Sequence, residues 1–190
     1  MKIIQSGSIF KIHSDDLVVK DKLPNGMYEV KFDRDNGFFL VAVDELELKE
    51  GKVYGSREEK IDKLVKAYES SPRSVGAILS GDKGIGKSLF TVMLANRMNS
   101  LGVPTILVKD AYPGITSFLE SIKQEVVVLF DEFEKMFNGD GEPQSRMLGM
   151  LDGMSNDKRM YLITVNEINR VIEYLINRPG RFHYHFTFAY

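Results

Sequence analysis

The chain has 190 residues, which is enough for one well-buried core with a small second module beside it. Its 25 basic and 27 acidic side chains give a formal charge of -2, so no overall field draws the protein to nucleic acid or to an anionic membrane. The lack of cysteine excludes disulfides, thiolate metal sites and cysteine nucleophiles, and it fits a reducing compartment.

No apolar run approaches the roughly 20 residues that are needed to cross a bilayer. The first residues, Met1 to Gln5, also lack the apolar core of a signal peptide. We therefore expect a soluble, cytoplasmic protein with no membrane partner.

The first 50 residues have the pattern of a small β domain. Apolar, aromatic and β-branched residues predict three strands, at residues 8–13, 26–32 and 37–43. The two connections between them contain Asn and Gly, which tolerate the positive φ of tight turns. The charged segment 45–52, with Gly51 near its end, can separate this domain from the rest, so we place the boundary after residue 50.

Strand-like and helical segments alternate in residues 51–190, as is typical of a parallel sheet with crossover helices. Helices are predicted at residues 57–69, 88–101, 115–123 and 144–154. Strands are predicted at residues 75–79, 105–108, 126–130, 160–165 and 183–188. The predicted fold class is a three-layer α/β domain with a five-strand parallel sheet, preceded by the small β domain.

A phosphate-binding loop is indicated by Gly81-Asp82-Lys83-Gly84-Ile85-Gly86-Lys87-Ser88-Leu89, which lies between a predicted strand and a predicted helix. Its glycines let backbone N–H groups face phosphates, and the helix N-terminus adds the positive end of its dipole. Lys87 is expected to reach the β- and γ-phosphates of ATP, and the Ser88 hydroxyl to bind Mg. The structural alternative is a glycine-rich turn ahead of a helix.

An acidic pair, Asp131-Glu132, directly follows the predicted strand 126–130. Ligands of open α/β sheets bind at the carboxyl ends of such strands. Asp131 is therefore expected to hold Mg, and Glu132 to act as the general base toward water. The alternative is a solvated strand end followed by a charged helix.

Three later segments stand in an order known from one family of ATPases. A strand ends in Leu162-Ile163-Thr164-Val165-Asn166, the segment 147–154 contains Leu-Asp-Gly, and Asn177-Arg178-Pro179-Gly180-Arg181 follows a helical stretch. With the loop and the acidic pair, these segments resemble the AAA (AAA+) family over residues 55–190. The resemblance implies that Asn166 positions the hydrolytic water, and that Arg178 and Arg181 reach the γ-phosphate of a neighbouring subunit. The alternative for the two arginines is a loop in which they bind backbone carbonyls.

A narrower resemblance, to phage-encoded AAA ATPases, rests on residues 131–135 and the β domain, and it implies the cytoplasm of a host cell. The sequence also departs from the family. Asp82-Lys83 stands where two prolines are frequent, and the helical lid that normally follows the fifth strand is absent, so the chain is expected to be truncated or minimal. This leaves subunit contacts and nucleotide affinity open.

The segment Lys109-Asp110-Ala111-Tyr112-Pro113-Gly114 stands where AAA motors carry a loop that faces a central pore. By this resemblance Tyr112 and Gly114 belong to a loop that grips the substrate, although Pro113 replaces the usual aliphatic residue. The alternative is a Pro-Gly turn with one exposed tyrosine. No metal is expected at the histidines, because His183 and His185 share a strand with no third ligand near them in sequence.

The function predicted is Mg-dependent hydrolysis of ATP by a homo-oligomeric ring, taken as a hexamer, that remodels or threads a macromolecule. Whether this macromolecule is protein or nucleic acid stays open. The alternatives are an ATP-controlled DNA-replication switch or helicase loader, and an assembly protein that binds ATP but barely hydrolyses it.

Overall fold

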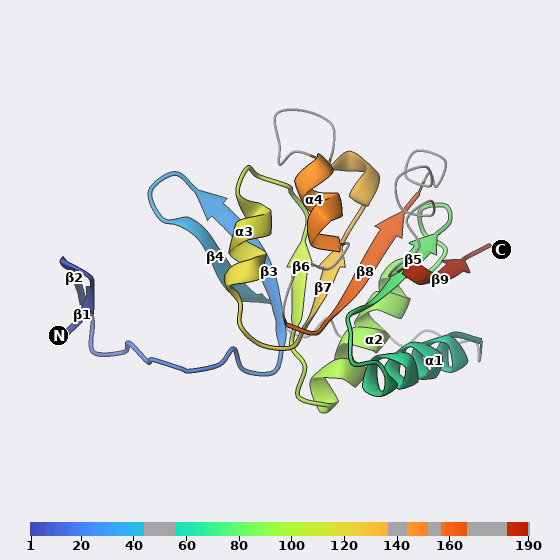
Figure 1. Cartoon of the computed structure of the whole chain (residues 1–190), viewed down its shortest axis with the longest axis horizontal. Coiled ribbons are helices and arrows are strands. Elements are labelled where there is room, and N and C mark those ends of the chain that lie inside the picture. Colours follow the sequence, from blue (N-terminus) through green and yellow to red (C-terminus); the bar gives the residue numbers. More distant parts are fainter. Residues whose placement is uncertain (44–55, 137–143, 152–156, 167–181, 190) are drawn as a thin grey trace.

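The computed structural model describes residues 1–43, 56–136, 144–151, 157–166 and 182–189. In these residues, helices cover both faces of a seven-stranded sheet (Figure 1). The helices are α1 (Ser56–Ser70), α2 (Lys87–Ser100), α3 (Ile115–Ser121) and α4 (Gln144–Leu151), with a short 3-10 helix, η1 (Phe133–Lys135). The strands are β1 (Lys2–Ser6), β2 (Ile9–His13), β3 (Met27–Asp33), β4 (Gly37–Val43), β5 (Val75–Ser80), β6 (Thr105–Val108), β7 (Val126–Phe130), β8 (Arg159–Val165) and β9 (Phe182–Thr187).

The predicted five-strand parallel sheet is confirmed. Its strands lie in the order β6-β7-β8-β5-β9, and every neighbouring pair is parallel. Strand β8 therefore lies between β7 and β5, although it follows both in sequence. The segments that leave the carboxyl ends of these three strands meet at one edge of the sheet, where ligands of α/β folds bind.

The sheet is buried on both faces, as the nearly continuous apolar runs of its strands predict. On one face α1 and α2 pack through Leu64, Phe90, Leu94 and Met98, all of which are inaccessible to solvent. On the other face α3 and α4 pack through Ile115, Leu119, Met147 and Met150. The strand ends that carry polar residues are thus held by a rigid core.

The hairpin β3–β4 is part of the main sheet. β3 pairs in parallel with β6 and antiparallel with β4, so that β4 forms one edge of the sheet. The sequence predicts both strands but places them in an independent β domain, because strand propensity does not reveal the pairing partner. The predicted boundary near residue 50 lies outside the described residues, and the division into domains stays a prediction.

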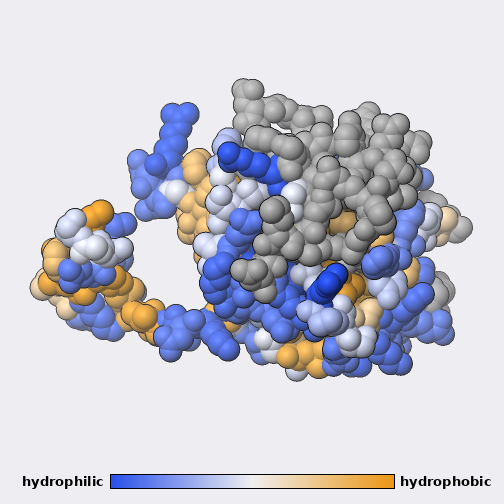
Figure 2. Space-filling model, in the orientation of Figure 1, coloured by the Kyte–Doolittle hydropathy of each residue, from blue (hydrophilic) through white to orange (hydrophobic). Residues whose placement is uncertain are grey.

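The strands β1 and β2 form a two-stranded sheet of their own, apart from the main sheet (Figure 1). The register places Ile3 opposite Ile12, so these residues and Phe10 share one face. Their side chains are largely exposed, and Figure 2 shows apolar surface on this part of the molecule. Strand β1 was not predicted from the sequence.

In the part of the chain described, no helix is long and apolar enough to cross a membrane.

Candidate functional site

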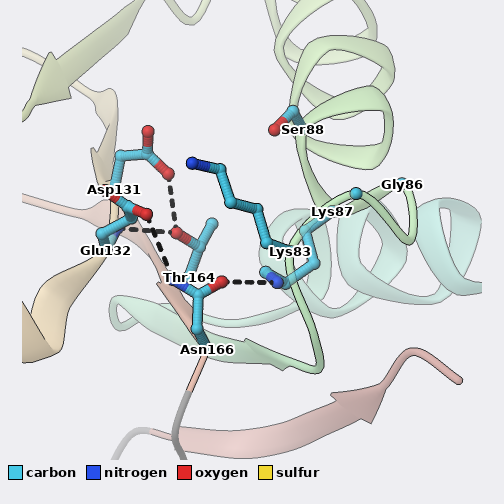
Figure 3. A pocket seen from close by; sticks show the side chains of 9 residues that line it. Lys83, Gly86, Lys87, Ser88, Asp131, Glu132, Thr164 and Asn166 are labelled. Atoms are coloured by element: carbon cyan, nitrogen blue, oxygen red, sulfur yellow. Dashed lines mark hydrogen bonds between the residues drawn. The ribbon is translucent and has the colours of Figure 1, made fainter.

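A pocket of about 390 Å³ lies at the carboxyl ends of β5, β7 and β8. One side is the loop between β5 and α2, and the opposite side is the turn after β7 together with the end of β8 (Figure 3). Lys83 reaches across the pocket toward Asp131 and Glu132, which form the acidic turn after β7 (Figure 3). The lining residues are Lys83, Gly84, Gly86, Lys87, Ser88, Asp131, Glu132, Thr164 and Asn166.

The loop owes its shape to glycines. Gly81, Gly84 and Gly86 all have positive φ values, a conformation that other residues adopt only at a cost. Gly86 is constrained a second time, because a Cβ atom there would lie 2.5 Å from Nη2 of Arg57 in α1. The same Nη2 donates a long hydrogen bond, 3.5 Å, to the carbonyl of Ile85. Arg57 thus lies against the outside of the loop, and the end of its side chain would have to move to admit a side chain at position 86.

The ammonium group of Lys87 is buried and fully bonded. It donates to the carbonyls of Gly81 and Asp82 and, over 3.0 Å, to Oδ1 of Asn166. Three acceptors therefore match its three protons. Burial lowers the pKa of Lys87, and the negative charges of four nearby carboxylates, beginning with that of Glu134, act against this shift.

The acidic turn is tied to β8 by one hydroxyl group. Thr164 Oγ1 lies 2.7 Å from Oδ1 of Asp131 and accepts a hydrogen bond of 2.9 Å from the N–H of Glu132. Glu132 has φ 51° and ψ 53°, and it is the one non-glycine residue with positive φ among those described. Such a conformation costs roughly 1–3 kcal/mol. Two hydrogen bonds at about 1 kcal/mol each are of the size needed to offset it.

The carboxylate of Glu132 is held by two partners. Lys135 forms an ion pair with Oε2, and Nδ2 of Asn166 donates to Oε1 over 3.1 Å. The hydrogen bond from Lys135 is the main reason that the pKa of Glu132 is lowered, partial burial acts in the other direction, and Asn166 adds to the lowering. Glu132 is therefore ionised and free to accept a proton at neutral pH.

Asn166 joins the two sides of the pocket. Its Oδ1 accepts from Lys87, and its Nδ2 donates to Glu132 and, over 3.0 Å, to Oε1 of Glu134. Glu134 Oε1 also accepts the backbone N–H of Asn166, at 3.0 Å. This second carboxylate fixes both the backbone and the amide of Asn166, so the amide oxygen faces the lysine.

Most of the predicted nucleotide-site residues therefore come together. Lys87, Ser88, Asp131, Glu132 and Asn166 line one pocket, with Lys83, Gly84 and Gly86 beside them. Gly81, Asp82, Ile85 and Leu89 were predicted to contact the nucleotide as well, but they do not line this pocket. Arg178 and Arg181 lie outside the described residues.

Four residues near the pocket were not predicted as site residues: Arg57, Thr164, Glu134 and Lys135. Glu134 and Lys135 follow the acidic pair directly, and their charges were a signal that could have been used. Thr164 carries a weaker signal, because it stands two residues before Asn166 and so points to the same face of β8. Nothing in the sequence links Arg57 to the loop.

Tyr112 lies away from the pocket, in the connection between β6 and α3, and 42% of it is exposed. Its ring stacks on that of Phe32 in the β3–β4 hairpin, with the ring centroids 5.1 Å apart. Gly114 caps the N-terminus of α3, and a Cβ atom there would lie 3.3 Å from the ring of Phe38. The predicted pore loop is thus packed against the hairpin, and its role stays a prediction.

The pocket has oxygen donors that suit magnesium. The Ser88 hydroxyl and the Asp131 carboxylate line it from opposite sides, and magnesium is typically held by one or two such groups together with phosphate oxygens and water. No cluster of three or more His, Cys, Asp or Glu side chains that could hold a metal occurs in the described part of the chain. The Ser88 hydroxyl and the Asp131 carboxylate therefore suit a magnesium ion that is held together with phosphate oxygens.

Comparison with known proteins gives one family match. Residues 77–190 match the model of a family described as the ATPase family associated with various cellular activities (AAA). The matched region begins within β5 and contains all of the pocket residues named above.

Two solved structures are similar to the chain in fold. The ORC2 protein of Aeropyrum pernix, in ADPNP–ADP complexes, has 15% sequence identity and a TM-score of 0.51, over 73% of this chain and 48% of that one. A variant of RuvB from Thermotoga maritima has 13% identity and a TM-score of 0.53, over 70% of this chain and 44% of that one. The chain spans about half the length of these proteins, and at such identities the likeness concerns the fold alone.

Proposed function

Because the chain belongs to the AAA family of ATPases, we propose that its pocket binds Mg-ATP and hydrolyses it to ADP and phosphate. The observation that carries the proposal is the geometry of Asn166, whose single amide contacts both Lys87 and Glu132. In this proposal, the group that meets the phosphates and the group that meets the attacking water lie on either side of one polar bridge.

In this proposal the loop holds the phosphates of ATP. Backbone N–H groups of the loop and the N-terminus of α2 face the triphosphate, and Lys87 exchanges its bonds to the loop carbonyls for bonds to phosphate oxygens. Asn166 then loses its contact with Lys87 and is free to orient water through its amide oxygen. ATP binding is in this way transmitted to the acidic turn.

Glu132, whose carboxylate is ionised at neutral pH, takes the proton from the attacking water. Ser88 and Asp131 hold magnesium, which neutralises charge on the transferred phosphoryl group when it is bound. Lys83 and Lys87, which both line the pocket, add positive charge that stabilises the phosphates.

We further propose that the active species is a homo-oligomeric ring, taken as a hexamer. The support is the resemblance of residues 178–181 to arginine fingers, which act on the ATP of a neighbour. The ring remodels or threads a macromolecule, and Tyr112 with Gly114 contacts that polymer in the central pore. An exposed aromatic ring can hold a passing chain by apolar and stacking contact regardless of its sequence.

The substitution Glu132→Gln tests the proposed reaction. The amide keeps the shape of the side chain but cannot accept the proton, so the turnover number is expected to fall by about 10²–10⁴-fold while ATP still binds. Lys87→Ala is expected to abolish binding instead. Turnover is measured by phosphate release and binding by a fluorescent ATP analogue, with Glu69→Gln on the exposed side of α1 as the matched control.

Hydrolysis at the parental rate by the Glu132→Gln protein would remove Glu132 as the base. Adding a polymer then separates the biological roles. Stimulation by unfolded protein supports threading, stimulation by DNA supports a replication switch or loader, and stimulation by neither supports the assembly protein.

A further inference from the structure

The hydroxyl group of Thr164 accepts one hydrogen bond and donates another. An N–H group can only donate and an ionised carboxylate can only accept, so the hydroxyl accepts from Glu132 N–H and donates to Asp131 Oδ1. One side chain of β8 thus bonds both members of the acidic pair in the turn that follows β7. Thr164 is 3% exposed, so its side chain is largely shielded from bulk water.

Burial alone does not explain why residue 164 carries a hydroxyl group. Thr105 in β6 is 1% exposed, and its hydroxyl has no hydrogen-bond partner among the described residues. A buried threonine in this sheet can therefore be accommodated for its shape, which valine would provide equally well. The paired hydroxyl of Thr164 is different, because its two partners are residues of the proposed catalytic site.

The first consequence concerns the Asp131 carboxylate. The hydrogen bond to Oδ1 stops the carboxylate from rotating, while the backbone N–H of the same residue is bonded to the carbonyl of Val108 at 3.0 Å. Side chain and backbone are thus anchored on opposite neighbours, β8 and β6. A carboxylate held in this way presents its second oxygen to the pocket in one orientation.

The second consequence concerns Glu132. Its N–H is held by Thr164 in β8, and its carboxylate is held by Asn166, the residue that directly follows β8. The backbone of Glu132 is left-handed where both contacts are made. Without the Thr164 hydroxyl, the backbone can relax toward the extended region and carry the carboxylate away from Asn166.

We propose that Thr164 is a positioning residue of the ATP site, whose hydroxyl sets Asp131 for magnesium and Glu132 for water. This inference rests on the proposed function, since it assigns a role within the same reaction. Thr164 touches neither the phosphates nor the water, and it acts through the two carboxylates.

The substitution Thr164→Val tests the inference, because valine keeps the branched shape and loses only the hydroxyl. The turnover number is expected to fall about 10- to 100-fold, and the magnesium concentration for half-maximal rate to rise several-fold, as for other residues that orient metal ligands. Binding of a fluorescent ATP analogue in EDTA should not change. Thr164→Ser keeps the hydroxyl and should stay within about threefold of the parent on all three measures.

Thr105→Val is the matched control, because it makes the same change in the same sheet where the hydroxyl is unpaired. It should leave turnover and magnesium dependence as they are. Thermal melting establishes that each variant is folded, and Thr164→Ala replaces Thr164→Val should the latter not fold.

The outcomes separate the two proposals. A parent protein that binds but never hydrolyses ATP overturns the proposed function and this inference with it. An active parent with a Thr164→Val variant of equal turnover and equal magnesium dependence overturns the inference alone. A loss of activity that Thr164→Ser shares in full would also overturn it, because the hydroxyl would then not be the cause.

Discussion

The phosphate loop and the acidic turn face each other across one pocket, but they are shaped in different ways. The loop has its positive φ values at Gly81, Gly84 and Gly86, where they cost little. The acidic turn has a positive φ at Glu132, where it is strained, and hydrogen bonds of Glu132 with Thr164 and Asn166 hold it. The loop is thus largely shaped by its own sequence, whereas the turn depends on a strand more than 30 residues away.

Because of this difference, the loop and the turn should be sensitive to different substitutions. The loop should fail when its glycines are replaced and should tolerate the loss of neighbours. The acidic turn should respond to changes in the side chains that surround it. Substitutions on the two sides therefore test whether the loop and the turn are shaped in different ways.

The largest effect is expected for Gly86→Ala. The new Cβ meets Arg57, and the residue must also adopt φ 93°, so nucleotide affinity should fall by about 5- to 30-fold from the backbone cost of roughly 1–2 kcal/mol alone. Titration with a fluorescent ATP analogue measures the loss. The double variant with Arg57→Ala removes the clash but not the strain. If the loop is shaped by its own backbone, the double variant should stay impaired, and full recovery would show that the clash alone was responsible.

A smaller effect is expected for Lys135→Met on the acidic side. Lys135 is the main cause of the lowered pKa of Glu132, so its removal raises that pKa. The carboxylate is then protonated at a higher pH, and the acid side of the ATPase pH profile should shift upward. Turnover measured across pH detects the shift. Lys31→Met is the control, because Lys31 forms a comparable exposed ion pair with Glu29 away from the pocket. An unchanged profile would mean that Lys135 does not set the protonation of the base.

The smallest effect is expected for Arg57→Ala. Its contact with the loop is a single long hydrogen bond to the Ile85 carbonyl, and a weak bond of this kind contributes at most about 1 kcal/mol. Affinity for ATP should therefore change by less than about fivefold. The same fluorescence titration measures it. A loss as large as that of Gly86→Ala would show that the loop depends on a neighbour after all, and the contrast between the two sides would disappear.

The same contrast explains what could be predicted from the sequence. The loop is a local pattern of glycines and a lysine, so its residues and its place before a helix could be identified. Asp131 and Glu132 could be predicted because they follow an apolar strand, and Asn166 because of its motif. The contacts of Thr164 depend on the register between β7 and β8, in which Phe130 pairs with Ile163, and no local pattern encodes that register. The pairing of β3 with β6 could not be predicted from the sequence for the same reason.

The strand order has a consequence for how the protein acquires its shape. β5 leads into the phosphate loop, yet its partners come late in the chain: Val75 pairs with Met160, and Ile78 pairs with His185. Contacts so distant in sequence form slowly, because a long chain segment must close before they gain any stability. During synthesis on the ribosome, β5, which leads into the nucleotide-binding loop, can therefore pair with its neighbours only after most of the chain has emerged. Nucleotide affinity should be among the last native properties to appear on refolding, and a fluorescent ATP analogue would then report the completion of the sheet.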